Sequence, residues 1–105
     1  MRLKTANIQV DGINVEITEL NGLAQIEMME ERRRLGDDAP ELIVNMRCAA
    51  IMFARCVVGW EGTPEDVLKR HRLETVLEVA AKINELSERG SKNSESAPNE
   101  DSSSG

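Results

Sequence analysis

Aromatic residues are almost missing from this sequence. Its 105 residues include one Phe, one Trp and no Tyr, although 40% of them are hydrophobic. The core must therefore be filled by aliphatic side chains and by Met, whose flexible side chain adapts to irregular gaps. A chain of this length forms one domain with a modest core, so surplus apolar surface would need a partner to cover it.

Positive charge is also in deficit. The chain has 13 Lys and Arg against 19 Asp and Glu, which gives a formal net charge of -6 and a pI near 4.8. Phosphate backbones and anionic lipids attract positively charged surfaces. We therefore expect neither nucleic acid nor a membrane to be the partner.

The sequence also lacks a long uninterrupted apolar run and a secretory signal. The longest apolar stretch, Leu42 to Val58, contains Asn45, Arg47 and Arg55 and is shorter than a bilayer-spanning helix. The first residues are polar, with no basic start that leads into an apolar run. We expect a cytoplasmic protein.

Residues with catalytic or ligand-binding chemistry are few. His71 is the single histidine, and its charged neighbours predict a solvated side chain. Cys48 and Cys56 are eight residues apart, a spacing that suits neither a CxxC redox pair nor a zinc half-site, so we expect buried thiols. Glu74 and Glu78 are interpreted as surface charges. Because phosphate-binding glycine loops and Cys/His clusters are also missing, we predict no enzymatic activity, no cofactor and no metal site.

A β-hairpin is predicted at the start of the chain. Asp11-Gly12 is a preferred pair for two-residue primed turns, in which both central residues adopt positive φ. An isolated hairpin is marginally stable, so helices must cover its apolar side. With the turn at Asp11-Gly12, that side consists of Ile8, Val10, Ile13, Val15 and Ile17.

Two of the three predicted helices are recognised from residues that mark where a helix starts or stops. Strong helix formers from about residue 20 to 35, stopped by Gly36, predict a first helix that is only weakly amphipathic. Thr63 as N-cap and Pro64 at the first helical position predict another helix, which continues to about residue 86. The apolar residues of that last helix share one face.

The middle helix, from about residue 40 to 58, is the most apolar part of the chain. Asp38 and Glu41 predict a capping box at its start, and Gly59 marks its end. A helix that is apolar nearly all round is usually buried on all sides. A short chain has little with which to bury it, so we predict a homo-oligomer that forms through this helix. Changing Ile51 to Glu is then expected to dissociate the oligomer without unfolding the domain.

Three polar or amphipathic side chains near this helix leave alternatives open. Arg47 and Arg55 either extend to water along the domain surface or meet the carboxylates of another subunit or partner, since an unpaired buried guanidinium is costly. Trp60 either anchors an interface or folds back onto the junction between the hairpin and the helices.

The fold class that these elements predict is α+β. An N-terminal β-hairpin packs on about three α-helices, and the folded domain comprises residues 1–87. Residues 88–105 offer almost no apolar surface. We expect them to form a disordered polar tail.

Several short segments, taken in their order along the chain, are similar to one protein family. They are Val10-Asp11-Gly12, Glu19-Leu20-Asn21-Gly22-Leu23, Cys56-Val57-Val58-Gly59-Trp60, Thr63-Pro64-Glu65-Asp66-Val67-Leu68, Ile83-Asn84-Glu85-Leu86-Ser87 and Lys92-Asn93-Ser94. Together they resemble the tail assembly chaperones of long-tailed bacteriophages. The resemblance implies a helper protein of the host bacterial cytoplasm that binds the tape measure protein, recruits subunits of the major tail protein and is absent from the mature virion.

The resemblance brings no active site, so the candidate contact residues come from the helices themselves. They are Met29, Arg47, Ile51, Arg55 and Trp60. The alternative function is a small regulatory or adaptor protein of a mobile element, such as an antitoxin-like module that binds another protein. A small enzyme without a recognisable motif is a third and weaker alternative.

Overall fold

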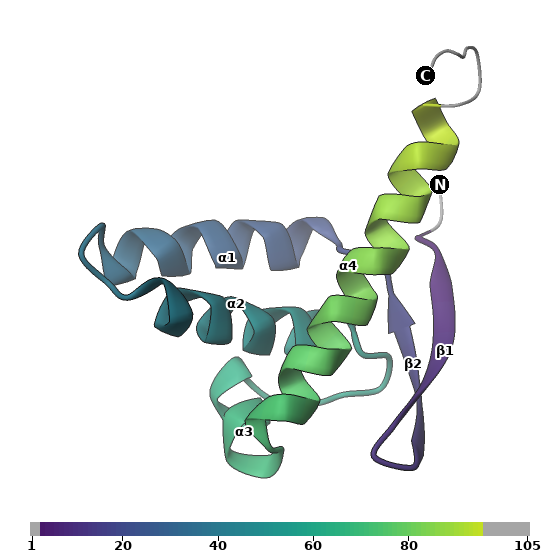
Figure 1. Cartoon of the computed structure of the whole chain (residues 1–105), viewed down its shortest axis with the longest axis horizontal. Helices are drawn as coiled ribbons and strands as arrows, with labels where there is room; N and C mark the ends of the chain where they lie inside the picture. Colours follow the sequence, from purple (N-terminus) through teal and green to yellow (C-terminus); the bar gives the residue numbers. More distant parts are fainter. Residues whose placement is uncertain (1–2, 96–105) are drawn as a thin grey trace.

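The computed structural model describes residues 3–95, and the side chains of residues 3–88, as a β-hairpin followed by four helices (Figure 1). The α+β fold class is confirmed. The elements are β1 (Thr5–Val10), β2 (Ile13–Thr18), α1 (Gly22–Leu35), α2 (Glu41–Cys56), α3 (Pro64–Arg70) and α4 (Leu73–Glu95).

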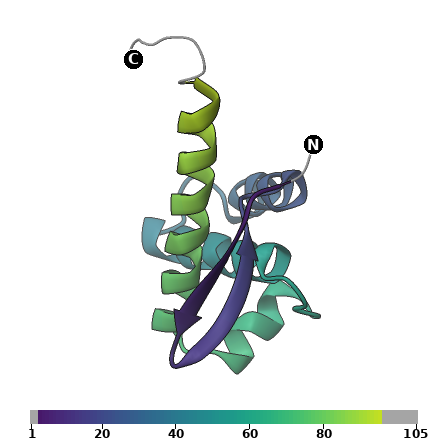
Figure 2. The ribbon, with the colours of Figure 1, turned by 90° about the vertical axis from the view of Figure 1, so that its right-hand side faces the viewer.

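The predicted hairpin is confirmed, with Val10 opposite Ile13 across the turn. Asp11 and Gly12 both have positive φ, 52° and 76°, as a primed two-residue turn requires. The apolar side of the hairpin packs against α4 (Figure 2). Ile13 is an exception, because it lies beside the turn and stays 63% exposed.

The chain that follows α2 returns to the hairpin and extends its sheet. Val57 forms an antiparallel bridge with Ile17, and the Val58 amide donates to the Glu16 carbonyl oxygen at 2.9 Å. This contact covers part of the outer edge of β2. It also ties the end of α2 to the hairpin.

The first two helices differ from prediction mainly at their starts. The N-cap of α1 is Asn21, whose Oδ1 accepts from the Ala24 amide at 2.8 Å. The capping box predicted from Asp38 and Glu41 is wrong, because α2 begins after Pro40 and no side chain caps its amides. Burial of the second half of α2 stabilises this helix without a cap.

The predicted third helix is in fact two helices. Thr63 and Asp66 form a capping box at the start of α3, but the chain becomes extended at His71, with φ -129° and ψ 150°, and α4 follows. The reason lies in Val67 and Val76, which are both fully buried. They are nine positions apart, about two and a half helical turns, so one straight helix would point them to opposite sides.

The end of α4 also differs from prediction. The helix continues to Glu95, past the expected end near residue 86, and includes the first residues of the predicted tail. The remainder of that tail, residues 96–105, lies outside the described residues.

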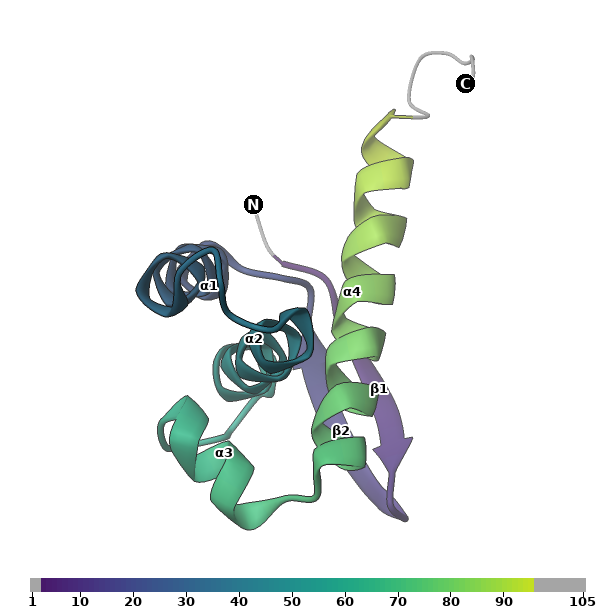
Figure 3. The same cartoon turned by 60° about the vertical axis from the view of Figure 1, so that its left-hand side comes forward.

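The core is centred on the second half of α2. Its run of residues 48–54 is buried throughout, because α1, α3 and α4 all contact this helix (Figure 3). A run buried on every side agrees with the all-round apolar sequence of the helix. The first half of α2 instead extends with α1 as a two-helix arm away from the hairpin (Figure 1).

Candidate protein-binding surface

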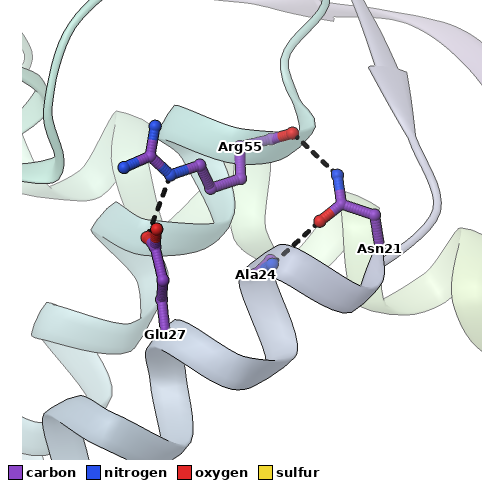
Figure 4. A network of polar contacts seen from close by, with 4 residues as sticks. All are labelled: Asn21, Ala24, Glu27 and Arg55. Atoms are coloured by element: carbon purple, nitrogen blue, oxygen red, sulfur yellow. Dashed lines mark hydrogen bonds and ion pairs between the residues drawn. The ribbon is translucent and has the colours of Figure 1, made fainter.

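A polar network fixes the base of this arm, where α1 begins and α2 ends (Figure 4). Besides capping α1, Asn21 donates from Nδ2 to the Arg55 carbonyl oxygen at 2.9 Å. Three residues after Ala24, Glu27 receives a hydrogen bond from Arg55 Nε at 2.9 Å. These contacts hold α1 and α2 in a defined antiparallel pairing, which determines what the arm presents to solvent.

The outer face of α1 carries an apolar stripe formed by Leu23, Ile26 and Met29. These side chains are 54%, 55% and 64% exposed. The opposite face of α1 packs on α2 through Ala24 and Met28, which are buried. Leu23, Ile26 and Met29, the outer stripe, therefore form a second apolar face of α1 that has no partner within the described chain.

Ile51 is not available for the contact predicted from the sequence. It is only 5% exposed and belongs to the core. The expectation that Ile51→Glu leaves the domain folded is therefore wrong, since it would place a carboxylate among buried apolar side chains. Self-association remains a prediction, but the exposed apolar residues of α2 are Leu42 and Ile43 at its start.

The two arginines of α2 have different surroundings. Arg55 meets its carboxylate within the chain, at Glu27, so it needs no partner protein to neutralise it. Arg47 is exposed and makes no ion pair among the described residues. It lines a hollow of about 520 Å³ between α1, α2 and α3, together with Ile51 and Arg34. On the wall of this hollow, a hydrogen bond from Arg34 lowers the pKa of Glu31.

Trp60 folds back onto the domain, which is the second of the two alternatives for this residue. Its ring and that of Phe53 form a T-shaped pair with 5.3 Å between centroids, and Arg70 Cζ lies over the Trp60 ring, 5.4 Å from its centroid. His71 packs on the same cluster, 4.8 Å from Phe53. The prediction of a solvated histidine is therefore wrong, and His71 is half-buried.

A further concave surface follows the line of contact between α1 and α2. One hollow of about 450 Å³ lies where these helices meet α4, and another of about 270 Å³ lies toward the loop at the tip of the arm. Both are lined by Arg32 and Asn45, so they are neighbours along the same line of contact, and we call the two hollows together the seam trough. Cys48 lies on its floor, and burial raises the pKa of this thiol.

Of the five predicted contact residues, the structure brings together Arg47 and Ile51 in one hollow and leaves Met29, Arg55 and Trp60 apart. The contact residues predicted from the sequence include Met29 but not Leu23 and Ile26, which share its exposed side of α1. The weak amphipathicity of residues 20–35 was the available signal, because apolar residues on both sides of a helix lower its amphipathicity.

Comparison with protein-family models, curated proteins and solved structures gives no match for this chain. Over residues 3–95, no helix combines the length and apolar character needed to cross a bilayer. Within the same part of the chain, no group of His, Cys, Asp and Glu side chains is arranged to hold a metal ion.

Proposed function

We propose that this protein is a tail assembly chaperone of a long-tailed bacteriophage. In the host cytoplasm it binds the tape measure protein and recruits subunits of the major tail protein. It leaves before the virion is complete. The outer stripe of α1 is the observation that carries this proposal.

The outer stripe suits the shielding of a helical partner. Leu23, Ile26 and Met29 follow one another at three-residue spacing on one side of α1, which is the arrangement that packs against another amphipathic helix. Contiguous exposed apolar surface on a small protein marks an interaction site. Tape measure proteins are long helical chains, and the net charge of -6 on this protein favours solubility of the complex.

The test is co-expression of this chain with the tape measure protein of the same phage. We expect a soluble complex that survives purification, and we expect Ile26→Glu to abolish it because a carboxylate then enters the apolar contact. Ile13→Glu is the matched control, since Ile13 is also exposed but lies at the hairpin turn. Circular dichroism should be the same for both variants and the parent.

Two results would count against the proposal. One is recovery of no tail protein with this chain from infected cells. The other is a complex that Ile26→Glu and Ile13→Glu leave equally intact. Recovery of a toxin or another regulatory protein in place of tail proteins would favour the adaptor function.

A further inference from the structure

We propose that the seam trough binds an amphipathic helix of the partner, about three turns long, with a carboxylate of that helix on Arg32. The inference deepens the proposed function and rests on it for the identity of the partner. It concerns a face different from the outer stripe, because Met28 and Arg32 line the trough from the α2 side of α1.

The dimensions of the trough fit a helix. Its lining residues on α2 extend from Glu41 to Met52, a rise of about 16 Å or three helical turns. Where α4 crosses, the wall includes the small side chains of Ala49, Ala80 and Ala81, flanked by Leu77 and Asn84 of α4. Small residues allow the backbone of an added helix to approach closely, so it would pack on α1, α2 and α4 together.

The floor of the wide part suits a partner of variable sequence. Met28 and Met52 lie on it, beside Cys48, and all three side chains are buried. Methionine side chains rearrange to fit different apolar anchors. A trough with such a floor can accept successive apolar segments along one long helical protein.

The charges around the trough define the chemistry of the bound helix. Arg32 lines both hollows and makes no ion pair among the described residues. It is the single charged residue on the wall of the wide part. Toward the tip of the arm, Asp37 and Glu41 line the narrower part. A complementary helix carries apolar residues where it lies beside α4 and Asp or Glu opposite Arg32. It carries Lys or Arg where it lies near the tip of the arm.

A display library of 14-residue amphipathic helical peptides, selected on the full chain, tests this inference. We expect enriched peptides with apolar residues at i, i+3 or i+4 and i+7 and an acidic residue on the same face. Arg32→Glu should weaken the binding of such a peptide at least about tenfold. A peptide with Lys at the acidic position should regain affinity for this variant.

Two further variants distinguish loss of binding in the trough from a general effect of the change in net charge. Ala81→Glu places a side chain into the trough from an exposed position on α4 and should also weaken binding at least about tenfold. Arg72→Glu makes the same charge change as Arg32→Glu at an exposed position between α3 and α4 and should leave binding unchanged. Peptides that bind all these variants equally, or a selection without enrichment, would overturn the inference.

The selection uses no phage protein. Its outcome therefore does not depend on whether the proposed function is correct. A tape measure complex that Arg32→Glu and Ala81→Glu leave intact would refute the trough alone. Absence of any tape measure complex, together with trough-dependent peptide binding, would refute the function alone. If sedimentation showed that Ala81→Glu converts a dimer into a monomer, the occupant would be a second copy of this chain, and the inference would be wrong.

Discussion

The side-chain amide of Asn21 donates to the main-chain oxygen of Arg55 at 2.9 Å, and so joins the first turn of α1 to the last turn of α2 (Figure 4). The same side chain accepts from the Ala24 amide. One residue thus caps one helix and pairs a terminal carbonyl of the next, which would otherwise need another partner. The orientation of the arm therefore depends on Asn21.

Replacing Asn21 with Ala should lower the free energy of unfolding by about 1–2 kcal/mol, because both hydrogen bonds are lost. Urea unfolding followed by circular dichroism measures the change. Asn7→Ala is the control: Asn7 is exposed on β1 and should change stability by less than about 0.5 kcal/mol. Equal effects of the two substitutions would show that the Asn21 contacts do not stabilise the arm.

Glu27 and Arg55 should show measurable coupling across the arm. Their side chains are 26% and 29% exposed, so solvent screens the pair and we expect a coupling free energy of about 0.5–1 kcal/mol. A double-mutant cycle with Glu27→Gln and Arg55→Met measures it by urea unfolding. Additive effects of the two substitutions would mean that the ion pair contributes nothing.

Ile51 and Ile26 should respond differently to the same truncation. Ile51→Ala removes buried methyl and methylene groups from the core and should cost about 2–5 kcal/mol of stability. Ile26→Ala acts on the outer stripe, where the side chain is 55% exposed, and should stay within about 0.5 kcal/mol. Thermal and urea unfolding distinguish the two positions. A costly Ile26→Ala would mean that the outer stripe is already covered within the chain.

Two proline substitutions test whether the helix is interrupted between α3 and α4. His71 has extended backbone angles, which suit the residue before a proline, so Arg72→Pro should cost less than about 1 kcal/mol. Lys82→Pro, in the interior of α4, should cost about 3 kcal/mol or more. If both substitutions were equally destabilising in urea, the chain would be one continuous helix through residues 71 and 72.

Asp66 should contribute to the pH dependence of stability. The main-chain amide of Thr63 donates to its carboxylate and, as the largest cause, lowers the pKa of Asp66 below its ordinary value of 3.8. The charged form is thus favoured in the folded state. The resulting stabilisation is fully present at a pH above the ordinary pKa of 3.8. It is lost as the pH falls through the lower pKa that Asp66 has in the folded protein.

The corresponding measurement is urea unfolding between about pH 2.5 and 6 for the parent and for Asp66→Asn. The variant cannot titrate at this position, so its stability should fall less steeply on acidification. Identical pH profiles for the two proteins would contradict the assignment of this carboxylate to the capping box.

Local signals in the sequence correctly predicted the hairpin and most helix boundaries. Asp11 and Gly12 both adopt the positive φ of the turn, Gly36 follows α1, and Thr63 caps α3, which begins at Pro64. Such signals act over a few residues, through φ preferences and unsatisfied amide groups. They therefore depend little on the rest of the chain, although the Asp38 and Glu41 signal failed at the start of α2.

The candidate surface could not be predicted in the same way. The sequence predicts both Met29 and Ile51 as contact residues, but Met29 is exposed whereas Ile51 is buried. Both are apolar residues on helices with apolar residues on more than one side. Their exposure depends on which neighbouring helices reach them, and that is a property of packing between distant segments.

The hairpin, the helical character of the rest and the acidic, aliphatic composition follow from the residues alone, because they depend on local conformational preference and on residue counts. The separation of α3 and α4 at His71, the enclosure of the second half of α2 and the exposure of the outer stripe and the seam trough arise from packing between distant segments. Burial is shared between elements, and α1, α3 and α4 all converge on α2, where residues 48–54 are buried. Little then remains to cover the outer face of α1.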